Sequence, residues 1–383
     1  MIMKKKVAII DPLGAHGSSH HFYLFGQLDG LRNNDVNIRL YTNSKTENPQ
    51  INRVRFYPTY GDLFSSNLTI VSGIKYILGS MKSVFHARFN GVSIFHFHIF
   101  YTNILVLFNL LLVKLLLGKV VLTIHDVTSF TEKDKSNLIS NLVYNLADLI
   151  ITHNQFSKDE IIKLNTSLKG NIHIIPHGNY VPFIHVQRDK KKSREYLNLP
   201  NEKTILLFFG MIKKVKGLDV LLQSFKTVVA TNPDTVLLIA GNLWENDFAD
   251  YQEIIDKNNL TEHIILHTKF IPHGDVEHYY CASDLVVLPY KKIYQSGVLM
   301  MTLSYERPAL VSDLPPLKEV VIDNENGFLF KSEDVNDLAE KINLILSDQE
   351  NLERVRKNGS TLINTKFGWD EIGRLTKLAY ETL

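Results

Sequence analysis

The sequence predicts an α/β protein built from two doubly wound parallel-sheet domains, and three observations lead to this fold class. The chain has 383 residues, more than one ordinary hydrophobic core organises, which favours two domains. Short apolar runs alternate with helical stretches from end to end, as in sheets joined by crossover helices. These runs are almost continuously Val, Ile, Leu and Phe, which is typical of parallel strands covered on both faces.

The alternation forms two series of strands separated by a polar segment. The first series is expected at residues 6–11, 36–42, 53–57, 92–98, 119–125, 148–152 and 171–175. The second is expected at 204–210, 235–241, 263–267, 284–289, 308–312 and 327–330. Helices are expected between them, including 136–146, 157–168, 218–230, 273–282 and 298–305, with three more beginning near residues 335, 351 and 369. The basic segment 188–202 has no long apolar run and is interpreted as the linker.

Composition narrows the classes of function. Hydrophobic residues make up 45% and charged residues 21%, as in a folded enzyme. A net charge of +2 lacks the basic surplus of a nucleic-acid binder. The lone Cys281 cannot form an intramolecular disulfide, and the apolar run 7–10 is too short for a secretion signal, which together indicate the cytoplasm. No HExxH, Cys/His or Asp-x-Asp spacing occurs, so no metal site is predicted.

The most apolar stretch is residues 104–117, and it is too short to cross a bilayer. It has 14 residues, including Asn109 and Lys114, whereas about 20 apolar residues are needed. Two interpretations stay open: a buried crossover helix, or a face that docks on an anionic membrane surface. The cations near it are Lys75, Lys82, Arg88, Lys114 and Lys119.

Loops after the strands of the first half supply one group of candidate site residues, because ligands of doubly wound sheets bind beyond the carboxyl ends of the strands. Gly14 and Gly17 follow the first strand, where the backbone either approaches a phosphate or sugar or simply turns. The loop is not a full GxGxxG motif, which disfavours a nicotinamide enzyme. His125 ends a strand, where it orients a hydroxyl or phosphate or caps the backbone. Further candidates at this edge are His20, His98, Asp126 and His177, and His98 shares a strand face with His96.

In the second half the candidates lie at helix starts. Gly210 ends a strand, and Lys216 directly precedes a predicted helix. A cation beside the positive start of a helix suits a diphosphate, although loop lysines are often only solvated. Ser296 and Gly297 open another helix and offer amides to a phosphate, which simple N-capping would also explain.

Taken in order, these segments resemble glycosyltransferase family 4, the large "group 1" retaining family, over nearly the whole chain. The first-half motifs are LTIHD (122–126), ADLIITHNQFSKDEI (147–161) and IIPHG (174–178). The second-half motifs are FFGMIKKVKGLDVLLQSF (208–225), ASDLVVLPY (282–290), PALVSDLPPLKEVV (308–321) and ENGFLF (325–330). The resemblance implies the GT-B fold, two Rossmann-like domains facing a cleft. An acceptor domain is expected at 1–185, a donor domain at 186–365, and a final helix, 366–383, crossing back to the first domain.

The resemblance also implies roles for particular residues. His125 matches the active-site histidine, and Lys216 matches the lysine that binds the donor diphosphate. The other donor-side residues are Gly210, Lys213, Phe270, Ile271, Tyr290, Gln295, Ser296, Gly297, Val298 and Glu319. The acceptor or phosphate side is assigned to Gly14, Gly17, His20, His98, Asp126 and His177.

The implied activity is retaining, metal-independent transfer of a sugar from a UDP- or GDP-linked donor, with no cofactor. The acceptor would be a glycan or lipid-linked molecule in bacterial cell-surface polysaccharide synthesis, with peripheral contact at the inner face of the membrane. The family's Glu-x7-Glu element falls on Ile293 and Met301, so Gln295 and Ser296 are expected to contact the sugar instead. Two alternatives stay open: an enzyme of the same architecture similar to UDP-sugar 2-epimerases, and an inactive scaffold protein, which the absent glutamate pair keeps open.

Overall fold

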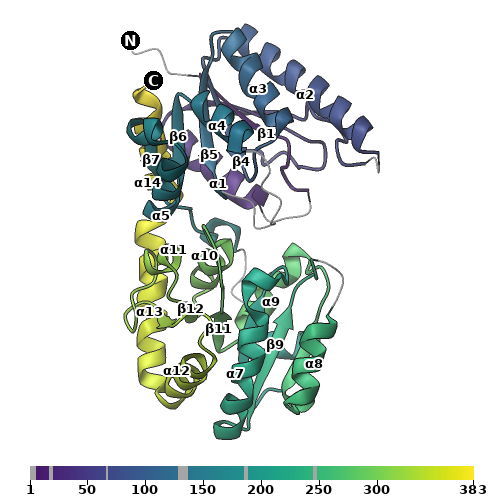
Figure 1. The fold of residues 1–383 in the computed structure, drawn as a ribbon, viewed down its shortest axis with the longest axis vertical. Coiled ribbons are helices and arrows are strands. Elements are labelled where there is room, and N and C mark those ends of the chain that lie inside the picture. The colour runs from purple at the N-terminus through teal and green to yellow at the C-terminus, as the bar shows by residue number, and fades with distance from the viewer. Residues whose placement is uncertain (1–5, 17–19, 66–67, 128–136, 185–188, 245–247) are drawn as a thin grey trace. The chain divides into compact units, whose positions relative to one another are not determined.

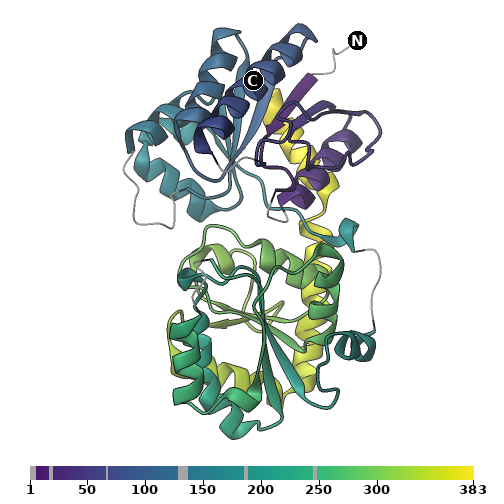
Figure 2. The same ribbon diagram turned by 90° about the vertical axis from the view of Figure 1, so that its right-hand side faces the viewer.

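The computed structural model describes all residues except 1–5, 17–19, 66–67, 128–136, 185–188 and 245–247, and it divides the chain into two compact units (Figure 1). Unit 1 comprises Met1–Gly178 and Phe367–Leu383, and unit 2 comprises Asn179–Lys366. Each unit is a parallel sheet with helices against both of its faces (Figure 2). The predicted Gly17 lies outside the described residues.

Unit 1 contains a seven-stranded sheet in the order β3-β2-β1-β4-β5-β6-β7, and every neighbouring pair is parallel. Val, Ile and Leu side chains of β1, β2, β5 and β6 are buried against α1 and α14 and form a core of this unit. The strands are β1 (Lys6–Asp11), β2 (Asn37–Thr42), β3 (Val54–Tyr57), β4 (Ile94–Ile99), β5 (Lys119–Ile124), β6 (Leu149–Thr152) and β7 (Ile172–Ile174).

The helices of unit 1 include one from the end of the chain. They are α1 (His20–Asn33), α2 (Thr69–Phe89), α3 (Ile104–Leu115), α4 (Asn137–Asn145), α5 (Gln155–Leu164), the 3-10 helix η1 (Thr166–Asn171) and α14 (Trp369–Glu381). α14 packs against α1 because both carry a glycine at the crossing. A Cβ on Gly373 would lie 2.1 Å from the carbonyl oxygen of Gly30. Any residue larger than glycine would clash at this crossing, because glycine alone has no Cβ.

Unit 2 contains a six-stranded parallel sheet in the order β10-β9-β8-β11-β12-β13. Its strands are β8 (Thr204–Phe209), β9 (Thr235–Ala240), β10 (Ile264–His267), β11 (Leu285–Leu288), β12 (Ala309–Ser312) and β13 (Phe328–Phe330). Its helices are α6 (Lys190–Tyr196), α7 (Leu218–Thr231), α8 (Ala249–Lys257), α9 (His273–Ala282), α10 (Gly297–Ser304), α11 (Pro315–Lys318), α12 (Val335–Ser347) and α13 (Gln349–Lys366), with short 3-10 turns at η2 (Val181–Phe183), η3 (Lys214–Lys216) and η4 (Thr261–His263). One large apolar core joins α7 and α12 to the sheet.

Each predicted strand run contains a strand of the structure, so the two-sheet prediction is confirmed. The helix expected at 157–168 is instead α5 followed by the tighter turn η1, because Asn165 is extended and caps that turn. The apolar stretch 104–117 forms α3. Among the described residues, no helix combines the length and apolar character needed to cross a membrane.

Candidate active site

Five buried histidines of unit 1 meet at the carboxyl edge of its sheet. They come from β4, from the residues just after β5, β6 and β7, and from the first turn of α1. In chain order they are His20, His98, His125, His153 and His177. Four of them were predicted from the sequence. His153 was missed, although THN after β6 repeats the pattern of IHD after β5.

A chain of ring-to-ring contacts links three of these histidines. His98 Nδ1 lies 3.2 Å from His125 Nε2, and His125 Nδ1 lies 3.2 Å from His153 Nε2. This series of contacts ends at the backbone, because His153 Nδ1 lies 3.0 Å from the carbonyl oxygen of Ile175. At its other end, His98 Nε2 lies 3.1 Å from Oε1 of Gln27, which is itself buried. The imidazoles are therefore oriented by fixed partners rather than by solvent.

Burial favours the neutral form of His98, His125, His153 and His177. It lowers the pKa of His98, His125 and His177 well below 6.5, and neighbouring histidines lower it further. Burial lowers the pKa of His153 to about 4, against a raising effect of its bond to Ile175. A neutral imidazole carries one N–H donor and one lone pair, so these four imidazoles can accept a hydrogen bond and orient a hydroxyl.

Aromatic rings hold His125 in place. Phe100 stacks on its ring at 4.5 Å between centroids, with planes 8° apart, and Tyr23 meets it edge-on at 5.0 Å. His20 also meets it edge-on, at 5.2 Å. A ring confined on several sides loses little further freedom when a substrate binds, which suits a catalytic group.

A buried carboxylate lies beside the histidines. Asp11 ends β1, is 1% exposed, and places Oδ2 2.9 Å from Nε2 of His20. Its Oδ1 accepts from the backbone N–H groups of Leu13 and Gly14 at 3.1 and 3.3 Å, which holds the predicted glycine loop beside the cluster. Asp126 follows His125 and is partly buried.

Among the described residues, one group of three side chains could hold a metal ion. His20, His98 and His125 each offer a nitrogen, and these nitrogens all lie within 4.8 Å of one another. No local spacing in the sequence indicates this arrangement, because the three ligands come from three separate elements of the sheet edge.

In unit 2, Lys216 ends the turn η3 directly before α7. Its Nζ donates to the hydroxyl of Tyr290 at 2.9 Å and lies 4.2 Å from the centre of that ring. The next residue, Gly217, has φ 68°, and a Cβ there would lie 1.8 Å from the carbonyl oxygen of Pro289. Only glycine fits this turn, which places the backbone of Lys216 next to the start of the helix, where a positive charge suits an anion.

The end of β8 and the start of α10 lie together. A Cβ on Gly210 would be 3.3 Å from a methyl group of Val298, and a Cβ on Gly297 would be 3.0 Å from the hydroxyl of Tyr180. The structure thus brings Gly210 beside the α10 residues that the sequence predicted. Lys213 stands over the ring of Trp244 at 3.8 Å, a cation–π contact.

The start of α10 combines a cap with an unsatisfied amide. The Ser296 hydroxyl accepts from the N–H of Leu299 at 3.1 Å, which is N-capping. Nε2 of Gln295 is buried and has no hydrogen-bond partner among the described residues. A buried amide N–H without a partner costs about 1–3 kcal/mol, so a ligand oxygen at this position would be favoured. Met301, at the second position of the absent glutamate pair, is buried.

The remaining predicted residues of unit 2 are more dispersed. Phe270 is exposed and Ile271 is buried, and both follow β10. Tyr290 is buried, and its hydroxyl meets Lys216 inside the unit. Glu319 is exposed at the C-cap of α11.

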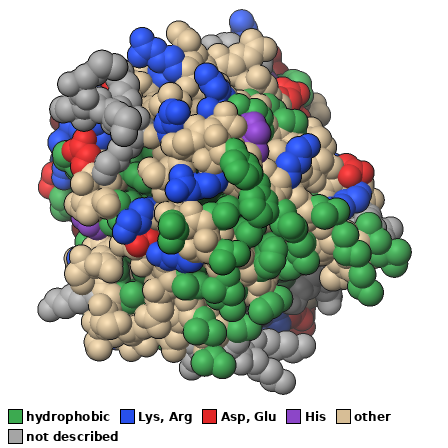
Figure 3. Space-filling model, turned by 90° about the horizontal axis from the view of Figure 1, so that it is seen from above, with side chains coloured by type: hydrophobic (Ala, Val, Ile, Leu, Met, Phe, Trp, Pro, Cys, Tyr) green, Lys and Arg blue, Asp and Glu red, His purple; other side chains and the backbone are tan. Residues whose placement is uncertain are grey.

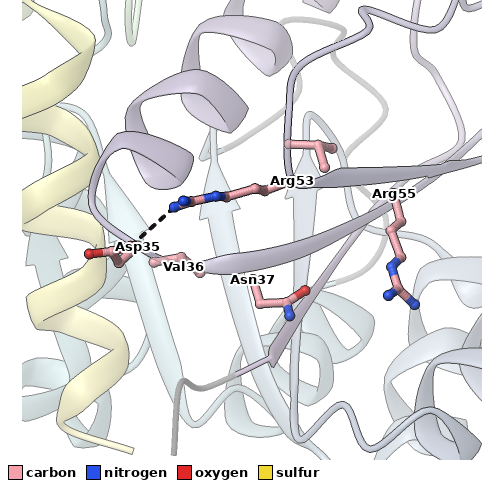
Figure 4. A pocket seen from close by; sticks show the side chains of 6 residues that line it. Asp35, Val36, Asn37, Arg53 and Arg55 are labelled. Carbon is pink, nitrogen blue, oxygen red and sulfur yellow. Dashed lines mark hydrogen bonds and ion pairs between the residues drawn. The ribbon is translucent and has the colours of Figure 1, made fainter.

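Unit 1 also has a pocket of about 400 Å³ at the opposite edge of its sheet (Figure 4). Residues 35–37 and 53–55 line it, at the amino ends of β2 and β3, and Arg53 reaches Oδ1 of Asp35 at 3.4 Å. Because ligands of parallel sheets bind at the carboxyl edge, the histidine edge and not this pocket is the candidate active site.

The two units therefore define a class of protein: one doubly wound unit with a histidine edge, and another with a cation placed before a helix. Two family models match the chain. Glycosyltransferase Family 4 matches residues 23–179, and Glycosyl transferases group 1 matches residues 189–361. The chain belongs to this family, the group 1 glycosyltransferases of family 4, as the sequence motifs predicted.

Among curated relatives, the capsular polysaccharide biosynthesis glycosyltransferase CapM of Staphylococcus aureus is 28% identical over 233 residues, which is 58% of this chain and 60% of CapM. Spore coat protein SA of Bacillus subtilis is 25% identical over 205 residues, 51% of this chain and 53% of that protein. The matched region thus spans only about half to three fifths of the length of these two relatives.

Solved structures share the fold over the whole chain. HepE from Anabaena, in complex with UDP, has a TM-score of 0.75 at 15% identity and covers 99% of this chain and 100% of its own. Sucrose-phosphate synthase from Thermosynechococcus elongatus has a TM-score of 0.76 at 18% identity, with 99% and 98% covered. At these identities the likeness concerns the fold alone, and it confirms the GT-B prediction.

Proposed function

We propose that this protein is a glycosyltransferase that moves a sugar from a nucleoside-diphosphate sugar onto a glycan or lipid-linked acceptor of a cell-surface polysaccharide. The observation that carries the proposal is the placement of Lys216 directly before α7 by a turn that only glycine permits. Family membership supports it, as do a relative named for capsular polysaccharide biosynthesis and HepE structures with UDP and UDP-glucose.

On the donor side, the residues of unit 2 would bind the diphosphate and stabilise it as it leaves. Lys216 supplies a positive charge, and the starts of α7 and α10 supply backbone N–H groups and the positive ends of helix dipoles. The unsatisfied Nε2 of Gln295 would donate to a hydroxyl of the donor sugar. An amide both donates and accepts, so it contacts a hydroxyl without burying a charge, unlike the absent glutamates.

On the acceptor side, His125 would hold the attacking hydroxyl. Because His153 is tied to a carbonyl through Nδ1, its Nε2 accepts from Nδ1 of His125, which leaves the lone pair on Nε2 of His125. That lone pair can accept a hydrogen bond from the acceptor hydroxyl. In the proposed retaining reaction, the bond between the anomeric carbon and the phosphate oxygen breaks, the hydroxyl oxygen bonds to the same face, and its proton passes to the leaving phosphate. No step of this proposed reaction uses a metal ion.

A nucleotide panel tests the proposal. The purified chain is heated with UDP, GDP, ADP and their sugars, and its melting temperature is recorded. A ligand that binds only the folded state stabilises it by about 2.7 kcal/mol at a hundredfold excess over Kd, so one nucleotide family should raise the melting temperature. The matching nucleotide sugar should be hydrolysed slowly to free nucleoside diphosphate without an epimer. If no nucleotide stabilises the chain and no sugar nucleotide is cleaved, the scaffold interpretation replaces the enzyme.

We also infer that unit 1 meets its lipid-linked acceptor at an anionic membrane surface. α2 and α3 expose a continuous apolar patch on one face (Figure 3). Six apolar side chains of these helices are 51–79% exposed, and together they are called the apolar face: Ile70, Ile74, Leu78, Ile104, Leu111 and Leu115. Ile70, Ile74 and Leu78 recur every four residues and so form one stripe of α2. Neither helix contains an acidic residue.

Charge around the apolar face has the sign that an anionic headgroup requires. Lys75 pairs with Asp62, and Lys114 and Lys119 share Asp148. Lys82 is exposed, and Arg88 donates to the carbonyl of Leu116. Three of the five cations pair with these two carboxylates, which leaves a positive surplus near the apolar face. An apolar surface with cations around it binds anionic bilayers.

Vesicle flotation tests this contact with phosphatidylcholine alone or mixed with phosphatidylglycerol. The wild type should float with the mixed vesicles, and Ile74→Ser with Leu78→Ser should stay in solution. Leu344→Ser on α12, at a leucine of unit 2 whose exposure is similar to that of Leu78, is the matched control and should float like the wild type. Flotation that is equal on both vesicles, or that is unchanged by the α2 substitutions, would contradict an anionic docking surface.

A further inference from the structure

The contact between His98 and His125 joins two atoms that both carry lone pairs. His125 Nδ1 donates to His153, because Nδ1 of His153 must itself donate to the carbonyl oxygen of Ile175. A neutral imidazole has only one N–H. Nε2 of His125, on the far side of the ring, is therefore unprotonated.

The same reasoning applies to His98 from the opposite side. Its Nε2 lies 3.1 Å from Oε1 of the buried Gln27. An amide oxygen only accepts, so Nε2 of His98 carries the hydrogen and Nδ1 carries the lone pair. Two lone pairs then face each other across 3.2 Å. Such a pair repels unless a cation lies between the nitrogens.

The geometry and charge of this place suit a metal ion. With Zn–N bonds of about 2.0–2.1 Å, two ligands of a tetrahedral site lie about 3.3–3.4 Å apart, close to the 3.2 Å observed. A third nitrogen, from His20, lies within 4.8 Å of the other two. The carboxylate of Asp11, 2.9 Å from His20, adds a buried negative charge. Each imidazole thus has the outer partner that metal-bound histidines usually have.

We propose that His20, His98 and His125 bind a divalent transition-metal ion of the Zn²⁺ type. The ion is not a cofactor of the transfer reaction proposed above. It occupies Nε2 of His125, the atom assigned to the acceptor hydroxyl, so a bound ion blocks transfer. The binding part of this inference stands on the histidine geometry alone, whereas the inhibition rests on the proposed function.

Metal titration of the untagged full chain, without substrates, tests the binding. Zn²⁺ is followed by calorimetry, and Co²⁺ by the visible absorption that a tetrahedral histidine site gives it. One ion per chain is expected at micromolar concentration. His98→Ala should abolish this binding, and Gln27→Ala should weaken it about 10- to 100-fold, as loss of an outer partner usually does. His173→Ala, a histidine of β7 away from the cluster, is the matched control and should bind as the wild type does.

Two results would overturn the proposal. If the wild type binds no ion, the Gln27 amide is turned so that it donates to His98, and a hydrogen bond joins His98 to His125. If His98→Ala binds zinc as tightly as His173→Ala does, the ion sits elsewhere. Melting curves of each variant show whether it is folded, and the wild-type titration decides the question even if His98→Ala does not fold.

The inhibition is measured separately on the active enzyme. Zn²⁺ should lower the rate of sugar transfer over the same concentration range as it binds, and EDTA should restore the rate. Binding without inhibition would leave the metal site intact and would contradict the role of His125. Because titration needs no substrate, a failure of the proposed function does not affect the binding result.

Discussion

Replacing Lys216 by alanine should weaken binding of the nucleoside diphosphate while leaving the fold unchanged. In the structure the Lys216 ammonium group is held by the hydroxyl and the ring face of Tyr290, 2.9 Å and 4.2 Å away. A hydrogen bond to a charged group contributes about 1.5–3 kcal/mol, which corresponds to a roughly 10- to 150-fold rise in Kd. The side chain is only partly buried, so the melting temperature without ligand should change little.

The matched control is Lys214→Ala in the same turn. Lys214 has the same charge and lies two residues away, but it is exposed. Calorimetric titration of both variants with the nucleotide that the panel identifies separates a specific contact from general attraction, since an exposed charge without a direct contact is weakened by water and salt. Kd should rise in Lys216→Ala and stay within about twofold in Lys214→Ala. An equal loss in both variants would refute a specific diphosphate contact.

Three further outcomes are expected. Gln295→Ala should lower transfer far more than it lowers binding of the free nucleoside diphosphate; if both fall equally, Gln295 contacts the nucleotide, and if neither falls, the start of α10 is structural. Trp369→Ala should destabilise unit 1 by about 3–5 kcal/mol. The Trp369 ring is buried and packs directly against Gly26 and Gly178, so its removal would leave a cavity there. Urea unfolding measures this loss of stability. The control is Trp244→Ala in unit 2, whose ring is half-exposed, and it should lower the free energy of unfolding of unit 2 by less than half as much. Transfer should survive EDTA, and a loss that magnesium or manganese restores would show that a metal is required.

Most of the fold followed from patterns within short windows of the chain. Continuous Val, Ile and Leu runs such as 204–209 predict buried parallel strands, because both faces of such a strand are covered, and they became β8 and its counterparts. His125 and Lys216 could be selected because each stands at a strand end or a helix start, positions that local sequence reveals. The family motifs then gave these residues their expected roles.

The contacts among the candidate residues were beyond local patterns. His98, His125 and His153 come from separate strands, and only the order β4-β5-β6 in the sheet brings their rings within hydrogen-bonding distance. Strand order depends on how crossover helices pack, which no single window of sequence encodes. For the same reason the sequence did not predict the facing nitrogens of His98 and His125, whereas His153 follows β6 as His125 follows β5 and could have been selected from that local pattern.

The sequence by itself therefore determined the elements, the two-sheet architecture and the family, because hydrophobic periodicity and turn residues act locally. The tertiary structure decided which polar atoms are buried together and which partners orient them. It left Nε2 of Gln295 without a hydrogen bond, and it placed Asp11 beside His20. Burial and contact are properties of the packed chain, and they set the tautomers and charges on which the chemistry of the site depends.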